Sequence, residues 1–262
     1  CDVRAPIDHA TACKLAEIRF PPLDAAGAST PFVRPPSNMG DVMVRAGDVL
    51  DMSPKEAERS LQRLYEAGRM SYPRAGSRGI SRGALRKVAA ALKKAGYPFD
   101  EGKVSDKTGN DVHDAPHPIG KVEVQRDPVR MGHEEGLRNL VARDLVRSGQ
   151  THVIETGIGS KAAKHLRSEG FAEAVCVAVG ALEWRRERGP RYPGQVSWPE
   201  SEVVVRRPDT VLLEHAVKAG LGRPSTWASH VDSFMGRGLV DENLKLTAKG
   251  LEWMAASPQI LL

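Results

Sequence analysis

The sequence predicts a mainly helical α+β protein, and two observations lead to this prediction. First, apolar residues recur at helical spacing in several segments, whereas short alternating runs typical of strands are few. Second, one order of elements occurs twice, in residues 41–74 and again from residue 209 to residue 246: helix, turn, helix, glycine and extended segment. That order is typical of the winged helix-turn-helix. We therefore expect two winged-helix units.

The composition is that of a water-soluble protein with a basic surface. The 262 residues are 40% hydrophobic and 27% charged, with a formal net charge of +5 and a pI near 9.2. No apolar run reaches the roughly 18 residues of a membrane span, and no signal peptide opens the chain. The positive charge modestly favours a polyanionic partner. Because the chain begins with Cys and not Met, we expect a piece of a longer polypeptide or a processed product.

The cysteines indicate a reducing environment. Cys1, Cys13 and Cys176 lie far apart and form no C-x-x-C pair. This spacing excludes a zinc ribbon and argues against a disulfide framework. It fits a cytosolic protein.

The first forty residues predict little regular structure. Residues 8–17 favour one short helix with Asp8 as its N-cap. Residues 18–23 favour an edge strand, because Pro21 and Pro22 cannot donate to a sheet. Residues 24–37 are expected to be a linker.

Two helices and an extended segment follow. A helix is expected over residues 41–50, and a second starts at the capping box of Ser53 and Glu56, with Pro54 as its first residue. Its apolar side is predicted from helical spacing: Ala57, Leu61, Leu64 and Tyr65. Gly68 is placed as the C′ residue that ends this helix. The first wing strand would then begin at Tyr72, with Tyr72 and Arg74 on one face.

The middle of the chain alternates helices and strands. Helices are expected over residues 82–95 and 134–148, and strands over 151–156, 172–179 and 203–205. The GIGSK segment at residues 157–161 lacks the spacing of a phosphate loop and is interpreted as a turn. The basic side of the helix over 82–95 is either a solvated surface or a phosphate contact, and comprises Arg82, Arg86, Lys87, Lys93 and Lys94.

The second repeat of the pattern ends the chain. A helix over residues 209–219 is expected to be capped by Asp209, and the next would start at Pro224 and end at Met235. Short strands are expected at residues 239–240 and 244–246, followed by a last helix from Thr247.

Three segments resemble conserved motifs of the type IA DNA topoisomerases, and they occur in the family's order. LYEAGRMSYPRAGSRGIS at residues 64–81 resembles the active-site tyrosine motif. HDAPHPI at residues 113–119 is similar to the family's H-E-A-I-R-P segment, and GLGRPSTWASHVDSFMGRGLV at residues 220–240 to its G-I-G-R-P-S-T-Y-A segment. The resemblance implies part of a topoisomerase torus, with a small β-rich arch beside the helical parts. It divides the chain into an arch segment and linker (1–30), a helical domain carrying the tyrosine (31–125), a β-rich arch or hinge (126–206) and a second winged-helix DNA-contacting domain (207–262).

The resemblance also assigns site residues. Tyr72 would attack DNA and form a transient link to a 5′ phosphate, and Arg74 would steady the phosphate, because a guanidinium matches two phosphate oxygens. The residues expected to contact DNA are Ser77, His113, Arg223, Ser225, Thr226 and Trp227. Several of these residues also have a plainer interpretation. Tyr72 packs at a helix–strand junction, His113 lies in a surface turn, Ser225 or Thr226 caps a helix, and Trp227 either stacks on a base or fills the core.

The chain departs from the family's pattern at two motifs. Ala75 and Gly76 stand where the family has Thr-Asp, so the carboxylate that would orient Arg74 is missing. Pro116 and His117 replace Ile-Arg, which removes an expected phosphate-binding arginine. The family's magnesium-binding TOPRIM domain has no counterpart here, so Mg²⁺ is expected only in a fuller enzyme. Such a domain either lies upstream of Cys1 or is missing because the chain is a non-catalytic derivative.

Three functions follow from these patterns. The leading hypothesis is the cleavage–religation core of a type IA topoisomerase, a monomer that acts on single-stranded or underwound DNA with a TOPRIM domain in cis or in trans, at the nucleoid. The alternative is a DNA-binding or architectural derivative that has lost the chemistry. A third, an unrelated two-wing transcription regulator, would bind duplex DNA as a dimer, and no heptad repeat supports it.

Overall fold

The computed structural model describes residues 9–18, 29–104, 106, 112–121, 124, 127–158, 160–180, 183–188, 206–241 and 244–256. The chain divides into two compact units. We call them the sheet unit (residues 1–34, 150–191 and 197–203) and the helical unit (residues 35–149, 192–196 and 204–262). The mixture of helices with a small sheet confirms the α+β class.

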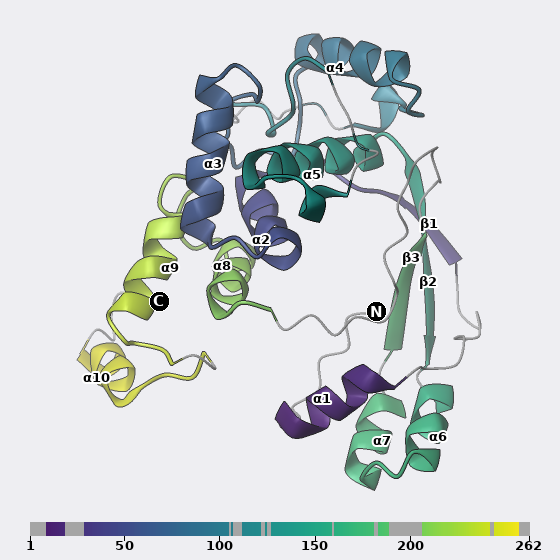
Figure 1. Cartoon of the computed structure of the whole chain (residues 1–262), viewed down its shortest axis with the longest axis vertical. Coiled ribbons are helices and arrows are strands. Elements are labelled where there is room, and N and C mark those ends of the chain that lie inside the picture. Colours follow the sequence, from purple (N-terminus) through teal and green to yellow (C-terminus); the bar gives the residue numbers. More distant parts are fainter. Residues whose placement is uncertain are drawn as a thin grey trace. The chain divides into compact units, whose positions relative to one another are not determined.

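Five helices of the helical unit share one apolar core: α2 (Met39–Leu50), α3 (Pro54–Glu66), α5 (His133–Ser148), α8 (Pro208–Lys218) and α9 (Trp227–Gly236). As Figure 1 shows, α2 lies among α3, α5 and α8, and α9 packs on α3 and α8. The largest fully buried side chains of this core are Met39, Met43, Met52, Leu61, Leu64, Met70, Leu137 and Leu213. Segments far apart in the sequence therefore meet in one core.

Capping boxes start the first two of these helices; the one at Ser53 was predicted, whereas the one at Asn38 was not, and α2 begins at Met39 and not at residue 41. The side chain of Asn38 accepts from the N–H of Asp41, and the Asp41 carboxylate accepts from Asn38, so α2 starts at a capping box. Ser53 and Glu56 form the same reciprocal pair at α3, with Pro54 at its first position. These bonds satisfy amide groups that a helix start leaves free.

Helix α8 is tied to α2 by charge. Arg206, just before α8, pairs with Asp48 of α2 at 2.7 Å and with Glu214 of α8 at 2.6 Å. Partial burial raises the pKa of Glu214, but hydrogen bonds from Lys218 and Arg206 lower it to about 2. Arg207 is the N-cap residue and Pro208 the first residue of α8, so the prediction that Asp209 caps this helix was wrong.

A second core forms between α5 and α4 (Arg82–Lys94). Its buried residues on α4 are Leu85, Val88, Ala89 and Leu92. Leu145 and Val146 of α5 pack into this second core, whereas Leu137 and Leu140 pack into the first. Because α5 serves both cores, its polar residues are also buried and need partners. The short helices η1 (Glu101–Lys103) and η2 (Pro128–Arg130) flank this region.

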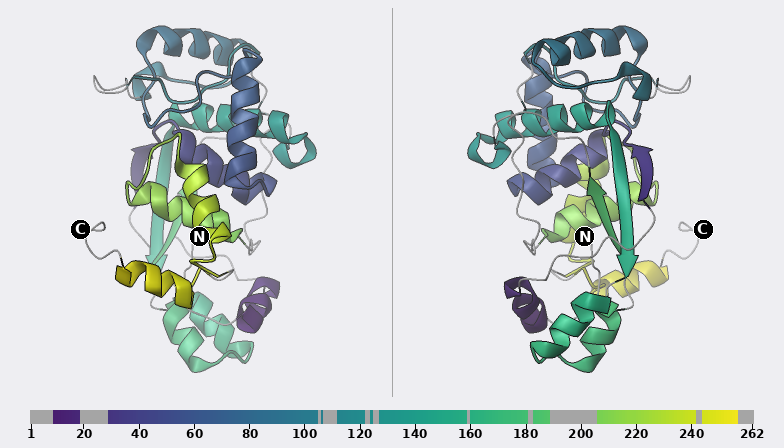
Figure 2. Two further views of the ribbon diagram at one scale, coloured as in Figure 1. Left: turned by 90° about the vertical axis from the view of Figure 1, so that its left-hand side faces the viewer. Right: turned by 90° about the vertical axis from the view of Figure 1, so that its right-hand side faces the viewer.

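The sheet unit contains three antiparallel strands in the order β1-β2-β3. Strand β2 (Thr151–Ile158) pairs with β1 (Ser29–Val33), where Pro31 faces Val153, and with β3 (Glu183–Arg188), where Arg186 faces Glu155. Figure 2 shows β2 leading into α6 (Ser160–Ser168), which packs on α7 (Glu173–Gly180). Leu15 of α1 (His9–Glu17) and Ile18, which follows that helix, pack against a small core around Leu166 and Cys176.

Several predictions for the sheet unit were wrong. Residues 173–179 of the strand expected over 172–179 lie in α7, and the expected linker over residues 24–37 contains β1. Strand β3 was not predicted at all, and the GIGSK segment spans the end of β2 and the start of α6. The strand over 151–156 and the helix over 8–17 are confirmed, except that Asp8 lies outside the described residues, as do residues 19–23 and 203–205.

The expected winged-helix units are not confirmed. Each expected wing is reduced to one isolated bridge, Met70 with Pro118 and Val240 with Leu246. Pro73 follows Tyr72 and has no N–H to donate to a neighbouring strand, so a first wing strand cannot continue there. Helix α9 starts at Trp227 and not at Pro224. The helix expected after Thr247 is α10 (Ala248–Ala256). The hydroxyl of Thr247 accepts a hydrogen bond from the N–H of Gly250 at 3.1 Å.

Candidate active site

The tyrosine motif starts at the turn that ends α3. Gly68 has a φ of +67°, in the left-handed region that glycine adopts most easily. The N–H of Gly68 donates to the carbonyl of Tyr65 at 2.8 Å, and that of Arg69 donates to Leu64 at 2.9 Å. This pair of bonds is a Schellman motif, which confirms Gly68 as the C′ residue. The chain is thereby turned back along α3.

The HDAPHPI segment closes the base of a loop that carries the tyrosine. The N–H of Ser71 donates to the His117 carbonyl at 2.9 Å, and the N–H of Ala115 donates to Gly79 at 2.8 Å. The N–H of His117 also donates to the hydroxyl of Ser71 at 2.9 Å. Residues 72–78, which we call the tyrosine loop, therefore bulge out between two points fixed by one neighbouring segment.

The start of α2 holds the other side of the tyrosine loop. The N–H of Met39 donates to the Ala75 carbonyl at 3.1 Å. Arg78 makes two hydrogen bonds of 2.8 Å to the carboxylate of Asp41. The hydrogen bonds to Asp41 raise the pKa of Arg78, so its guanidinium remains charged. The loop is thus fixed to an element of the main core.

Tyr72 is half-buried between two aromatic rings. The ring of His113 lies 4.3 Å from that of Tyr72, centroid to centroid, and Tyr65 makes an edge contact at 5.4 Å. Among the residues that the structure describes, the Tyr72 hydroxyl has no hydrogen-bond partner. His113 was predicted only as a DNA contact, and the structure places its ring against that of Tyr72. The ring is held while its hydroxyl stays available.

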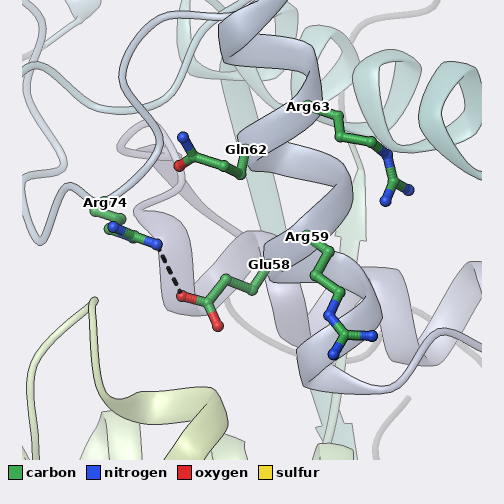
Figure 3. A pocket seen from close by; sticks show the side chains of 5 residues that line it. All are labelled: Glu58, Arg59, Gln62, Arg63 and Arg74. Atoms are coloured by element: carbon green, nitrogen blue, oxygen red, sulfur yellow. Dashed lines mark ion pairs between the residues drawn. The ribbon is translucent and has the colours of Figure 1, made fainter.

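Arg74 contacts α3 and not Tyr72. Its guanidinium pairs with the carboxylate of Glu58 at 3.6 Å, beside a pocket of about 310 Å³ that α3 and Arg74 line (Figure 3). Residues 71–81 form no strand, so the prediction that a strand places Tyr72 and Arg74 on one face was wrong. The two side chains have separate partners.

The GRPST segment lies against the tyrosine loop. A Cβ added to Gly76 would stand 3.7 Å from Cγ of Pro224, an ordinary contact. Arg223 and Ser225 are exposed beside it. The hydroxyl of Thr226 accepts from the N–H of Arg223 at 3.1 Å, but it makes no cap bond to α9. Arg223 is thus an exposed residue that directly precedes Pro224, the residue that touches the tyrosine loop.

Two predicted DNA contacts are buried instead. Trp227 is 7% exposed, belongs to the main core and donates its indole N–H to the Leu221 carbonyl at 2.8 Å. Of the two interpretations that the sequence left open, the structure shows the one in which Trp227 fills the core. Ser77 is 4% exposed, and its hydroxyl accepts from the N–H of Gly79 at 3.0 Å.

Comparison with known proteins identifies the relatives of this arrangement. No protein-family model matches the chain. DNA topoisomerase 1 of Mycobacterium leprae (strain TN) is 26% identical over 265 aligned positions, and the match covers 84% of this chain and 27% of that protein. The chain is related to the type IA DNA topoisomerases. It spans little more than a quarter of the length of this curated relative.

A solved structure matches at the level of the fold. Full-length topoisomerase I from Thermotoga maritima superposes with a TM-score of 0.50, over 97% of this chain and 48% of that one. The two sequences are 15% identical. The likeness covers nearly the whole of this topoisomerase-related chain.

The positions at which this topoisomerase relative departs from the family's motifs are mostly buried. Ala75 is 2% exposed and Pro116 is also buried. His117 is 7% exposed and its Nδ1 lies 2.9 Å from the Ala115 carbonyl. These side chains support the loop from within. Gly76 differs, because it is exposed.

Sequence reasoning missed two residues of this topoisomerase-related site, Tyr65 and Glu58. Tyr65 was expected to be buried with Leu64 but is 41% exposed and touches Tyr72. Glu58, Gln62 and Tyr65 are spaced by four and three residues, so they share a side of α3. That spacing was the available signal for a helix face turned toward the tyrosine loop.

The described part of this topoisomerase relative shows neither a metal cluster nor a membrane helix. No group of three or more His, Cys, Asp and Glu residues is arranged to hold a metal ion among the residues described. Nor do the described helices include one that is long and apolar enough to cross a bilayer.

Proposed function

We propose that this chain carries the strand-cleaving centre of a type IA DNA topoisomerase, with Tyr72 as its nucleophile. The supporting observation is that three segments meet at one loop. His113 of the HDAPHPI segment packs on Tyr72, and Pro224 of the GRPST segment lies against Gly76. In the sequence these segments are separated by tens to more than a hundred residues. DNA, single-stranded or underwound, is the proposed substrate.

The proposed chemistry is a transfer of one phosphodiester bond. The Tyr72 oxygen attacks a backbone phosphorus, the bond from phosphorus to the 3′ oxygen breaks, and the 5′ phosphate becomes linked to tyrosine. The phenol gives up its proton and the departing 3′ oxygen takes one up. Religation is the reverse step, so the bond energy is conserved and no ATP is required.

The side chains near Tyr72 suit this reaction. A phenol ordinarily has a pKa near 10 and needs a nearby cation to attack at neutral pH. Arg74 and His113 both lie next to Tyr72, in sequence or in space, and both can donate to phosphate oxygens. Arg223, exposed beside the loop, is a candidate for a neighbouring backbone phosphate.

The proposed role of Mg²⁺ comes from the family resemblance and not from residues of this chain that the structure describes. The family resemblance assigns Mg²⁺ to a TOPRIM domain, and the described residues here offer no acidic cluster that fits the ion. A TOPRIM domain, in cis or in trans, is accordingly part of the proposal and not of this site.

A trapping assay tests the proposal. The chain is mixed with a labelled single-stranded oligonucleotide, Mg²⁺ and a TOPRIM fragment, and then denatured to reveal a covalent adduct. We expect an adduct that Tyr72→Phe abolishes. Tyr65→Phe is the matched control, because it removes the hydroxyl of the neighbouring ring and keeps the ring contact with Tyr72. An adduct that persists in Tyr72→Phe contradicts the assignment.

A second candidate is a DNA-binding derivative of this core without chemistry. It is favoured by one observation: within the described residues the Tyr72 hydroxyl contacts no cation, and Arg74 is paired with Glu58. In this case the chain binds the oligonucleotide, and Tyr72→Phe leaves that binding unchanged. No adduct forms, even with a TOPRIM fragment that has been shown to assemble with the chain.

A further inference from the structure

Arg74 is approached from α3 by two acceptor side chains. In Figure 3, Glu58 and Gln62 extend toward Arg74, whereas Arg59 and Arg63 extend to the other side of the helix. The Glu58 carboxylate is the partner of Arg74 at 3.6 Å. The pocket is therefore not a cluster of arginines facing one anion. On this side of α3 one guanidinium faces a carboxylate and an amide, while Arg59 and Arg63 line the rest of the pocket.

Glu58 is the more buried member of this ion pair. The Glu58 side chain is 21% exposed and that of Arg74 is 39% exposed. The Oε1 atom of Gln62 is buried and has no hydrogen-bond partner in the part of the chain that the structure describes. An unpaired buried acceptor beside a guanidinium offers a second hydrogen bond that would fix the same orientation.

The tyrosine loop lacks an acidic residue where one would face Arg74. Along this loop exposure alternates, with residues 74, 76 and 78 exposed and residues 73, 75 and 77 buried. Arg74 and residue 76 thus lie on the same, outer side, but residue 76 is glycine. The guanidinium of Arg78 is already paired with the carboxylate of Asp41. Glu58 is the carboxylate that the structure places on Arg74.

We propose that Glu58 is a positioning residue, which holds Arg74 in the orientation that receives the DNA phosphate. A guanidinium has five N–H donors, so one edge stays on Glu58 while another binds two phosphate oxygens. The carboxylate comes from helix α3 and so takes the place of one from the loop itself. This inference rests on the proposed function, because it concerns the phosphate that Tyr72 attacks.

Charge-removing and charge-restoring variants test this role. Glu58→Gln keeps the shape and removes the charge, and we expect the rate of adduct formation at saturating oligonucleotide to fall about tenfold. The dissociation constant for the oligonucleotide should stay equal or decrease, since one negative charge is lost. Glu58→Asp keeps the charge and should retain activity within about threefold of the unmodified chain.

A second-site variant separates positioning from a merely structural role. Gly76→Asp places a carboxylate on the outer side of the loop, and it fits because an added Cβ meets only Pro224, at 3.7 Å. In the Glu58→Gln background we expect Gly76→Asp to restore most of the lost rate. Glu101→Gln is the matched control: it also removes one carboxylate from an exposed ion pair, with Lys93 at 3.4 Å, and should leave the rate unchanged.

The outcomes distinguish this inference from the proposed function. If the unmodified chain forms an adduct that depends on Tyr72 and Glu58→Gln reacts as fast or faster, the positioning role is overturned and the proposed function stands. If no variant forms a Tyr72-dependent adduct, both are overturned. A loss in Glu58→Gln that neither Glu58→Asp nor Gly76→Asp recovers also contradicts positioning.

Discussion

Trp227 illustrates how much a single side chain depends on its surroundings. A tryptophan in a DNA-contacting segment either stacks on a base or packs inside, and its sequence neighbours do not distinguish the two. The structure places its ring in the core and gives its N–H the Leu221 carbonyl as an acceptor. The polar residues of the same segment, Arg223 and Ser225, are exposed. Trp227 thus anchors the loop that presents them.

We expect Trp227→Ala to destabilise the helical unit by about 3–5 kcal/mol, because it leaves a large cavity. Trp227→Phe should cost less, since it keeps most of the packing and loses the hydrogen bond to Leu221. Trp253→Ala is the control, because Trp253 is 41% exposed. Denaturant unfolding measures all three, and equal losses for Trp227→Ala and Trp253→Ala would contradict the burial of Trp227.

Tyr65 shows a residue that periodicity alone misplaced. It follows Leu64, which is 1% exposed, and both fit an apolar stripe of the predicted helix. One residue along a helix is a rotation of about 100°, so only one of the two can face the core centre. Tyr65 therefore lies on the side of α3 that carries Glu58 and Gln62, where it contacts Tyr72.

At the level of elements, the sequence predicted helices well and the sheet poorly. The capping boxes of α2 and α3 and the glycine turn after α3 are local, so the sequence contains them in full. Strand β3 has the sequence EWRRER and β1 contains Pro31, so neither resembles a strand by itself. Each exists through pairing with β2. The apolar run of α7 fits a short strand and a buried helix equally, and its packing on α6 decides.

Helix packing itself yields a prediction at Gly47. This residue lies in α2 where α8 crosses, and a Cβ added there would overlap the side chain of Thr210, which is fully buried. We expect Gly47→Ala to destabilise the fold by about 1–3 kcal/mol, because α2 and α8 must move apart. In α4, Gly83 has open space around an added Cβ. Gly83→Ala should therefore be neutral or stabilise by up to about 1 kcal/mol, and thermal unfolding of the two variants tests the contrast.

At the scale of the whole molecule, three motifs that are distant in the sequence form one site within the helical unit. The sequence alone gave the order of these motifs, and the resemblance suggested that they act together. Their contacts arise because α2, α3, α8 and α9 share a core, which brings Pro224 to the tyrosine loop. The net charge of +5 belongs to the entire chain and does not say where DNA lies. Substitutions of individual arginines can show where DNA binds.

The last prediction separates a local phosphate contact from bulk charge. Arg223 is exposed beside the tyrosine loop, so we expect Arg223→Gln to weaken single-stranded DNA binding and to reduce the slope of log affinity against log salt by about 0.7. Arg167→Gln removes the same charge from the sheet unit, where Arg167 pairs with Glu173, and should leave that slope unchanged. Titration of a fluorescent oligonucleotide at several salt concentrations measures both. Equal slopes for the two variants would mean that positive charge attracts DNA without a defined contact at Arg223, whereas a difference confined to Arg223→Gln places the DNA backbone at Arg223, beside the segment that touches the tyrosine loop.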